Sequence, residues 1–183
     1  MSHTPGHRAS GGAPPSTTVR AARPGDAAAI AAIYNEGIAD RIATFETEPR
    51  TTAQMAAWLE AKAGRYPVVV AERDGRVVAW AAASSYRPRA CYDGVAEFSV
   101  YAARAARGTG AGRAALEALI EACEAAGFWK LVSRIFTENS VSRALCRRLG
   151  FREVGTYRRH ARLDGIWRDT VIVERLLGEA REE

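Results

Sequence analysis

The 183-residue chain contains few of the residues from which metal sites and disulfide frameworks are built. It has only three cysteines and three histidines. Cys91, Cys123 and Cys146 show no metal-ligand spacing, and an odd number of cysteines cannot all pair within one chain. We therefore predict no metal site. Unpaired thiols are typical of proteins in a reducing compartment, so we expect a cytoplasmic protein.

Long apolar runs are also missing. Residues 1–17, MSHTPGHRASGGAPPST, are dominated by Gly, Pro, Ser and Thr, which predicts a disordered tail. This segment lacks the apolar core of a signal peptide, and no later stretch approaches the length of a membrane span. We predict one folded domain over residues 18–178, a short charged tail over 179–183, and no association with a membrane.

The net charge of +5 is not accompanied by a nucleic-acid-binding motif. Arginines are scattered, with small clusters such as 104/107/113 and 158/159/162. Basic residues around a cleft also attract small anionic ligands. We therefore expect no nucleic-acid partner and an anionic small molecule instead.

The most informative stretch is a glycine-rich loop, Arg107 to Gly112 (RGTGAG), which follows the strand-like segment EFSVYA and precedes a helix. Alternate glycines let backbone N–H groups approach one anion, and the helix directs the positive end of its dipole to the same place. A P-loop would need Lys-Ser or Lys-Thr after its last glycine, where this chain has Arg113 and Ala114. The spacing G-x-G-x-x-G of dinucleotide-binding loops is not present in the loop either.

Local signals predict an alternating order of strands and helices. The helix after the loop carries apolar residues at helical spacing, namely Leu116, Leu119, Ile120 and Cys123. Thr51 and Gln54 form a capping-box pattern, Asn139 or Ser140 caps a helix bearing Val141, Leu145 and Leu149, and Asp74-Gly75 and Asp164-Gly165 predict hairpin turns. The expected order is β-α-α-β-β-β-α-β-α-β-β.

The pattern R-x-x-G-x-G, formed by Arg107, Gly110 and Gly112, resembles the acyl-CoA signature of the GNAT acyltransferase superfamily. Four further segments resemble its phosphinothricin N-acetyltransferase branch, which includes enzymes for arsinothricin and methionine sulfoximine: residues 33–49, 86–101, 136–151 and 164–177. The resemblance runs from about Val19 to Leu177. It implies an α+β GNAT fold with a mixed, mostly antiparallel central sheet of about seven strands and flanking helices.

The resemblance also implies acetyl-CoA as cosubstrate. Backbone groups of one strand would meet its pantetheine arm, the glycine loop would hold the pyrophosphate, and one asparagine would contact the arm as well. The residues concerned are Val100, Tyr101, Ala102, Arg107, Gly108, Thr109, Gly110, Ala111, Gly112, Arg113 and Asn139. A simple helix cap is an equal explanation for Asn139, and both roles are compatible.

Glu97 matches the glutamate that the branch uses as general base. An α-amine is mostly protonated at neutral pH, so a base must accept its proton. The alternative for Glu97 is a structural ion pair. Cys146 stands where many relatives have a tyrosine that protonates the leaving thiolate, and a small buried side chain is the simpler interpretation. Tyr101 and Tyr157 remain possible acids.

Substrate recognition is inferred from the branch. It implies substrate-pocket roles for Phe45, Arg87, Arg89 and Tyr92, since planar guanidinium groups suit carboxylates and tetrahedral oxyanions. An exposed turn is the alternative for the two arginines. The branch usually forms homodimers, so we expect a dimer.

The predicted function is acetyl transfer from acetyl-CoA to the α-amine of a small anionic amino-acid analogue, such as phosphinothricin, arsinothricin or methionine sulfoximine, in detoxification. Two rival functions remain open. One is an acetyltransferase for protein N-termini or lysines. The other is a module that binds CoA without catalysis, as a sensor or regulator.

Overall fold

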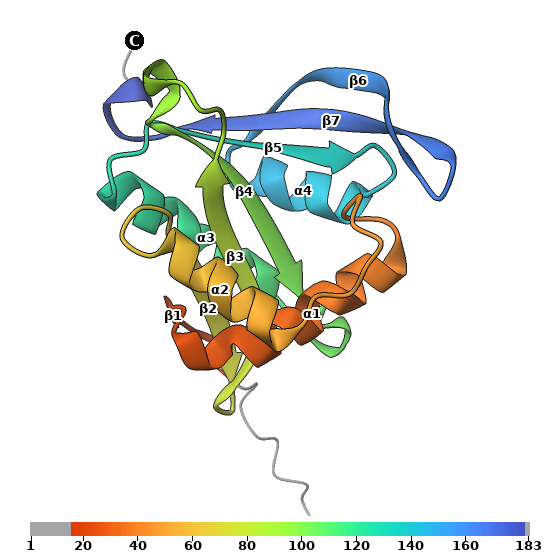
Figure 1. Ribbon diagram of the computed structural model, residues 1–183. Helices are drawn as coiled ribbons and strands as arrows, with labels where there is room; N and C mark the ends of the chain where they lie inside the picture. The colour runs from red at the N-terminus through yellow and green to blue at the C-terminus, as the bar shows by residue number, and fades with distance from the viewer. Residues whose placement is uncertain (1–15, 182–183) are drawn as a thin grey trace, which may run out of the picture.

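The structure is a computed structural model that describes residues 16–181. It forms a seven-stranded sheet with helices on both faces (Figure 1). Most of the tail expected over residues 1–17 lies outside the described residues, as do the last two residues of the tail expected over 179–183. No helix between residues 16 and 181 combines the length and the apolar character needed to cross a bilayer.

The elements follow the order expected from the sequence. The strands are β1 (Thr18–Ala21), β2 (Val68–Arg73), β3 (Arg76–Ser85), β4 (Val95–Ala102), β5 (Lys130–Phe136), β6 (Arg152–Leu163) and β7 (Ile166–Leu176). The α-helices are α1 (Ala27–Asp40), α2 (Thr52–Lys62), α3 (Ala111–Ala125) and α4 (Ser140–Arg148), and short 3₁₀ turns cover Pro24–Asp26, Ala90–Tyr92, Arg104–Ala106 and Gly178–Arg181. The sheet order is β1-β2-β3-β4-β5-β7-β6, which confirms the predicted α+β class.

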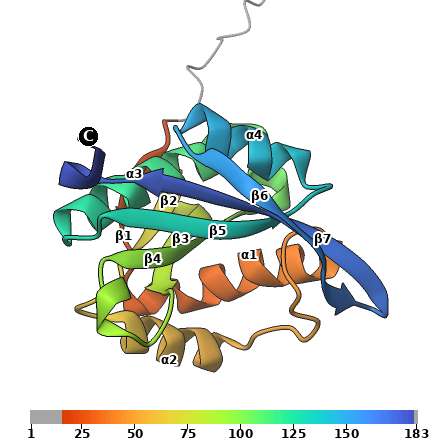
Figure 2. The ribbon, with the colours of Figure 1, turned by 90° about the horizontal axis from the view of Figure 1, so that it is seen from above.

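Two apolar layers hold the helices on the sheet. Figure 2 shows α1 and α2 below the sheet and α3 and α4 above it. Alternate residues of β3 face the two layers: Ala79, Ala81 and Ala83 pack toward α3, whereas Trp80 and Ala82 pack toward α1 and α2. The apolar residues predicted on α3 are all buried in the upper layer. The small side chains of β3 let α3 approach the sheet closely.

The local signals for turns and caps are confirmed. Asp74 and Gly75 have φ of 49° and 72°, as the predicted two-residue hairpin turn requires. Thr51 accepts from the Gln54 amide at 3.2 Å, and Gln54 accepts from the Thr51 amide at 2.9 Å. The predicted helix with Val141, Leu145 and Leu149 is α4, although Val141, in its first turn, is 79% exposed.

One pairing in the sheet is unusually short. β4 and β5 are the only parallel neighbours among the described strands, and they pair over three positions, Val95–Glu97 with Lys130–Val132. After these three positions, β4 continues to Ala102 and β5 to Phe136 without pairing with each other. The two strands therefore part, and backbone groups on their facing edges have no strand partner.

Candidate active site

A row of side chains from β3 and β4 faces the layer of α1 and α2. Three cross-strand pairs form it: Trp80 with Tyr101, Ala82 with Ser99, and Ser84 with Glu97. Because side chains alternate along a strand and directly paired residues share a face, these six point to the same side. The sequence analysis named Glu97 of this row as a base and Tyr101 as a possible acid, but it missed Ser99, which the period-2 spacing of 97, 99 and 101 places on the same face.

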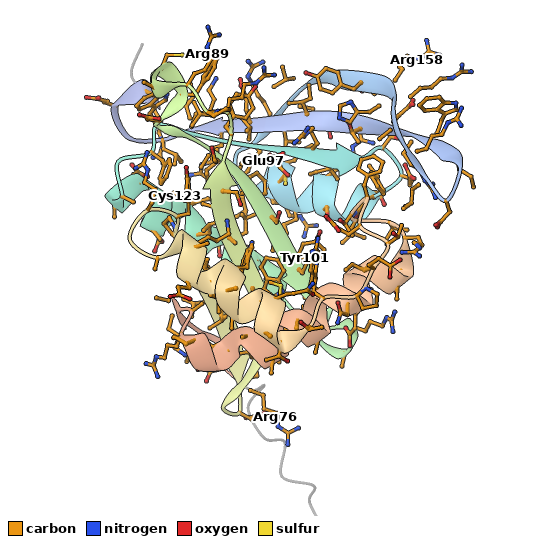
Figure 3. The ribbon with its side chains drawn as sticks, viewed as in Figure 1. Arg76, Arg89, Glu97, Tyr101, Cys123 and Arg158 are labelled. Atoms are coloured by element: carbon orange, nitrogen blue, oxygen red, sulfur yellow. The ribbon has the colours of Figure 1, made fainter. Side chains whose placement is uncertain are left out.

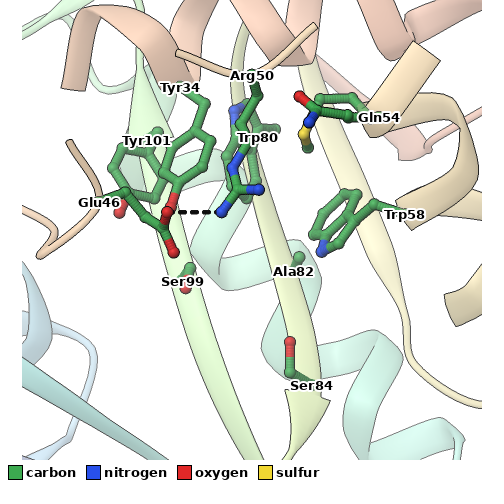
Figure 4. Close-up of a pocket in the computed structure, with 11 residues that line it drawn as sticks. Tyr34, Glu46, Arg50, Gln54, Trp58, Trp80, Ala82, Ser84, Ser99 and Tyr101 are labelled. Atoms are coloured by element: carbon green, nitrogen blue, oxygen red, sulfur yellow. Dashed lines mark hydrogen bonds and ion pairs between the residues drawn. The ribbon is translucent and has the colours of Figure 1, made fainter. Parts of the chain in front are cut away.

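A first cavity of about 260 Å³ lies between this row and α2 (Figure 4). Its lining combines aromatic rings with a few polar groups: Tyr34, Glu46, Arg50, Gln54, Met55, Trp58, Trp80, Ala82, Ser84, Ser99 and Tyr101. Within it, Arg50 Nη2 donates to Glu46 Oε2 at 2.6 Å. Apolar walls with a few polar groups are typical of small-molecule sites.

A second cavity of about 310 Å³ opens where β4 and β5 part. Its lining comes from both strands, from α1 and the loop after it, and from β6: Tyr34, Ala43, Thr44, Phe45, Glu46, Glu97, Phe98, Ser99, Tyr101, Ser133, Arg134, Phe136, His160 and Ala161. The two cavities share Tyr34, Glu46, Ser99 and Tyr101, so they adjoin each other, and we call the two together the cleft. The sequence-predicted residues Glu97, Phe45 and Tyr101 meet there.

Glu97 is paired with an arginine that the sequence analysis did not single out. Arg134 of β5 donates through Nε to Glu97 Oε1 at 3.0 Å, and its Nη2 donates to the same oxygen. Within residues 16–181, the other carboxylate oxygen, Oε2, has no hydrogen-bond partner. The ion pair considered as an alternative role for Glu97 is therefore present, and it leaves one oxygen of the carboxylate available to a ligand.

Tyr101 is packed among aromatic rings. Its ring centroid lies 4.9 Å from that of Tyr34 and 4.9 Å from that of Trp80. Its hydroxyl donates to the carbonyl of Ala43 at 3.3 Å. Burial between these rings raises the pKa of the phenol, so Tyr101 is neutral at physiological pH.

The glycine loop lies between the end of β4 and the start of α3. Gly108 and Gly110 have φ of 74° and 91°, a region that side chains disfavour. No acceptor in the described part of the chain pairs with the amide N–H of either residue. Arg73 holds the loop by donating to the Thr109 carbonyl at 2.7 Å. The amides and the first turn of α3 form a cradle of N–H donors, an arrangement that suits an anion.

The arginines of the loop are occupied by neighbouring carboxylates. Arg107 Nη1 lies 2.6 Å from Asp40 Oδ2, and the two arginines Arg104 and Arg107 hold the pKa of the Asp40 carboxyl below its usual range. Arg113 pairs with Glu117 one turn along α3. The cradle is therefore formed chiefly by backbone groups rather than by guanidinium groups.

Asn139 caps α4, as its local pattern predicted. Its Oδ1 accepts from the Ser142 amide at 3.1 Å, and its Nδ2 donates to the Ile42 carbonyl at 3.1 Å. These bonds join the start of α4 to the loop that borders the second cavity. One hydrogen of Nδ2 is left for a ligand.

Cys146 lies in the upper apolar layer and is 1% exposed. Burial raises the pKa of its thiol to about 12. This is the environment of a small buried side chain, in agreement with the simpler interpretation from the sequence. Tyr157, which the sequence left as a possible acid, is 47% exposed on β6 and lines neither cavity.

The remaining predicted substrate residues lie outside both cavities. Arg87 and Arg89 are exposed in the segment between β3 and β4, and Tyr92 packs its ring against Tyr86 at 5.5 Å. Figure 3 shows Arg89 beyond the start of β4, on the far side of Glu97 from Tyr101. Their role in substrate binding stays a prediction.

Lys62 is a charged residue near the cleft that the sequence analysis missed. At the end of α2 it is 7% exposed, and its Nζ donates to the Ala83 carbonyl at 2.6 Å and to Ser84 Oγ at 2.5 Å. Burial lowers the pKa of this ammonium to about 8. Ser84 itself lines the first cavity. Among residues 16–181 there is no cluster of three or more His, Cys, Asp or Glu side chains that would hold a metal ion.

The fold thus places a cleft, at the point where two strands part, beside a glycine loop with unpaired backbone amides. The sequence pattern of the acetyltransferase (GNAT) family matches residues 30–151. The chain therefore belongs to the GNAT family, and it is an N-acetyltransferase.

Its relatives include a phosphinothricin N-acetyltransferase of Alcaligenes faecalis, which is 36% identical over 87% of this chain and 82% of the relative. An L-methionine sulfoximine/L-methionine sulfone acetyltransferase of Pseudomonas paraeruginosa is 34% identical over 91% of this chain and 98% of the relative. These names agree with the resemblance found in the sequence.

Among solved structures, a GNAT superfamily phosphinothricin acetyltransferase from Sinorhizobium meliloti in complex with AcCoA is similar with a TM-score of 0.85. It is 36% identical, and the match covers 91% of each chain. A ribosomal-protein-alanine N-acetyltransferase from Brucella melitensis gives a TM-score of 0.84 at 34% identity, over 87% of this chain and 99% of that one.

Proposed function

We propose that the protein transfers the acetyl group of acetyl-CoA to the α-amine of a small anionic amino acid of the phosphinothricin or methionine sulfoximine type. The observation that carries this proposal is the position of the Glu97 carboxylate. It lies in the cleft where β4 and β5 part, on the strand that leads directly into the phosphate-binding cradle. A base and a binding site for the acetyl donor thus share one strand.

The residues along the cleft fit acetyl-CoA. The unpaired edge of β4 at Val100, Tyr101 and Ala102 offers backbone groups to the pantetheine amides, as a neighbouring strand would. The amides of residues 108 and 110–113 offer donors to the pyrophosphate, and Asn139 offers the remaining N–H of its amide.

Glu97 acts as the general base in this proposal. An α-ammonium must lose a proton before its nitrogen can form a bond to the acetyl carbon, and Oε2 of Glu97 is available to take that proton, directly or through a water. The carbon–sulfur bond then breaks and CoA leaves as a thiolate. Cys146 is buried with its proton held tightly, so we assign it no part in this step.

The finer parts of the proposal are a cytoplasmic location, a role in detoxification and a homodimer. Arg87 and Arg89 are exposed beside the start of β4, at a surface available to a second subunit. In a dimer with pockets near the subunit contact, these arginines would reach a cleft that they do not line within one chain. Their conformation in such a dimer is part of the prediction.

A second candidate is acetylation of protein N-termini, which the similarity to the ribosomal-protein-alanine N-acetyltransferase favours. A module that only binds CoA is disfavoured, because it has no use for a carboxylate with a free oxygen in the cleft.

The test is thiol release from acetyl-CoA with a panel of acceptors. The panel contains phosphinothricin, methionine sulfoximine, methionine sulfone, unmodified amino acids, and peptides with free N-termini. We expect the highest kcat/KM for the free amino-acid analogues. A ranking led by peptides would favour the second candidate, and turnover of no acceptor together with tight CoA binding would favour the non-catalytic module.

A further inference from the structure

We propose that Arg134 binds the α-carboxylate of the amino-acid substrate while Glu97 binds its α-amine. This inference rests on the proposed function and assigns the specificity-determining residue of that site. The observation behind it is that Arg134 contacts only one of the two carboxylate oxygens of Glu97. Two of the three nitrogen atoms of Arg134, Nε and Nη2, donate to Oε1, so Glu97 Oε2 and Arg134 Nη1 are left without a partner among the described residues.

An α-amino acid carries an ammonium and a carboxylate on one carbon atom. A site that binds both must present an anion and a cation side by side, which is the arrangement of Glu97 and Arg134. The free carboxylate oxygen of Glu97 suits the ammonium, and the outer edge of the guanidinium offers N–H groups for the carboxylate. The substrate would therefore extend the existing ion pair instead of having to break it.

The location of Arg134 supports this role. It lines the second cavity on β5, opposite Ser99 and Tyr101 of β4, where the acetyl group must arrive. Its side chain is 48% exposed, so it is solvated enough to exchange water for a carboxylate at small cost. Arg87 and Arg89, the cations expected from the sequence, do not line either cavity of the single chain.

One other arginine competes for this assignment. Arg50 lines the first cavity and donates to Glu46 Oε2 at 2.6 Å. It contacts no part of Glu97, and Arg134 is the arginine that pairs with that carboxylate. Because amine and carboxylate are attached to the same carbon, only a cation adjacent to the base can reach the carboxylate of an amine that is bound there. Arg50 is placed to contact a more distant group of the substrate.

The assignment predicts discrimination by the carboxylate itself. A peptide N-terminus, an amino-acid amide and a methyl ester keep the amine but lack the adjacent negative charge. They leave the guanidinium without its ligand, so they should be poor acceptors even when their side chains are identical.

The experiment compares methionine sulfone with its carboxamide as acceptors for the wild type, Arg134→Ala, Arg134→Lys, Arg50→Ala and Arg76→Ala. Arg76 is an exposed arginine at the start of β3, far from Glu97 (Figure 3), and serves as the matched control. The readout is the ratio of kcat/KM for the acid to kcat/KM for the amide. The KM for acetyl-CoA and the thermal midpoint report whether each variant keeps its fold.

We expect the wild type and Arg76→Ala to favour the acid by at least about tenfold, as charge-assisted hydrogen bonds to a carboxylate imply. Arg134→Ala should bring the ratio close to one, Arg134→Lys should restore part of it, and Arg50→Ala should keep it. If turnover by Arg134→Ala is too slow, calorimetric titration of the acid and the amide into the CoA-saturated variant gives the same ratio as Kd values.

Two results would overturn the assignment in distinguishable ways. A wild type that acetylates the free acid, with an Arg134→Ala variant that keeps the full preference, refutes the role of Arg134 and leaves the proposed function intact. A wild type that prefers the amide or peptides refutes the proposed function, and the assignment of Arg134 falls with it.

Discussion

Gly37 lies so close to Tyr101 that a Cβ atom added to it would be 2.8 Å from ring carbon Cδ1. Glycine inside a helix costs stability relative to alanine, about 1 kcal/mol in an exposed position. Its presence in the middle of α1 is explained by this contact, because the Tyr101 ring needs the space of the missing side chain. α1 therefore sets the position of a ring that lines both cavities of the cleft.

Replacing Gly37 with alanine should displace the Tyr101 ring and lower kcat/KM for the amino-acid substrate by about tenfold or more, in line with the cost of misplacing groups in an active site. Steady-state kinetics measure this. Gly155→Ala is the matched control, because a Cβ at Gly155 meets nothing within 4 Å and Gly155 lines neither cavity. Equal kinetics for the two variants would contradict the positioning role of Gly37.

Gly110→Ala should weaken acetyl-CoA binding more than Arg107→Ala does. The φ of 91° at Gly110 is strained for alanine, so the variant should rearrange the cradle, with a loss of about tenfold in Kd. Arg107 is already paired with Asp40, so its removal should change Kd by less than about threefold. Calorimetry with acetyl-CoA gives both values. The reverse order would mean that side-chain charge, not the backbone, holds the pyrophosphate.

Glu97→Gln should lower kcat by about a hundredfold or more while the KM for acetyl-CoA stays nearly unchanged. Glutamine keeps the shape of the side chain and still accepts a hydrogen bond from Arg134, but it does not take a proton at neutral pH. The measurement is kcat against pH for both proteins. Wild-type turnover with an unchanged pH profile would remove Glu97 from the mechanism and leave it as a structural partner of Arg134.

Lys62 should make stability depend on pH. Burial lowers its pKa in the folded protein from 10.5 to about 8. Between these two values the unfolded chain binds a proton that the folded chain has lost, so stability rises with pH. Below pH 8 both states are protonated and the cost of burying the charge is fully present.

The measurement is the free energy of unfolding of the wild type minus that of Lys62→Met, from pH 7 to 10.5. We expect this difference to rise by up to roughly 3 kcal/mol. The subtraction removes the opposite trend from the buried thiols of Cys123 and Cys146, whose folded-state pKa values are raised to about 12. A difference that stays flat would show that Lys62 is solvated in the folded protein.

Much of the fold could be predicted because its signals are local. Asp74-Gly75 determines a hairpin turn through the φ values that its residues tolerate, and Thr51 with Gln54 marks a helix start within four residues. The exposure of Val141 shows what local signals leave open. Helical spacing relates Val141 to Leu145 and Leu149, but it does not show which of these side chains the rest of the molecule covers.

The site could be predicted only in part, because only some of its residues carry local signals. The glycine loop and Glu97 lie within one continuous stretch of sequence that carries its own pattern. Arg134 is 37 positions along the chain from Glu97. Their contact depends on the register of β4 against β5 and on the point where these strands part. The sequence shows only that Arg134 is a single arginine in a largely apolar strand, and this does not indicate that Glu97 is its partner.

The short contact between β4 and β5 also has a mechanical consequence. Strands β1–β4 and β5–β7 form two blocks, each held together by long antiparallel pairings, and only three residue positions join them through strand pairing. The two blocks of the sheet are therefore joined by one short paired segment. A molecule bound along the unpaired edges of β4 and β5 contacts both blocks, so occupancy of the cleft should make the whole molecule more rigid rather than the cleft alone.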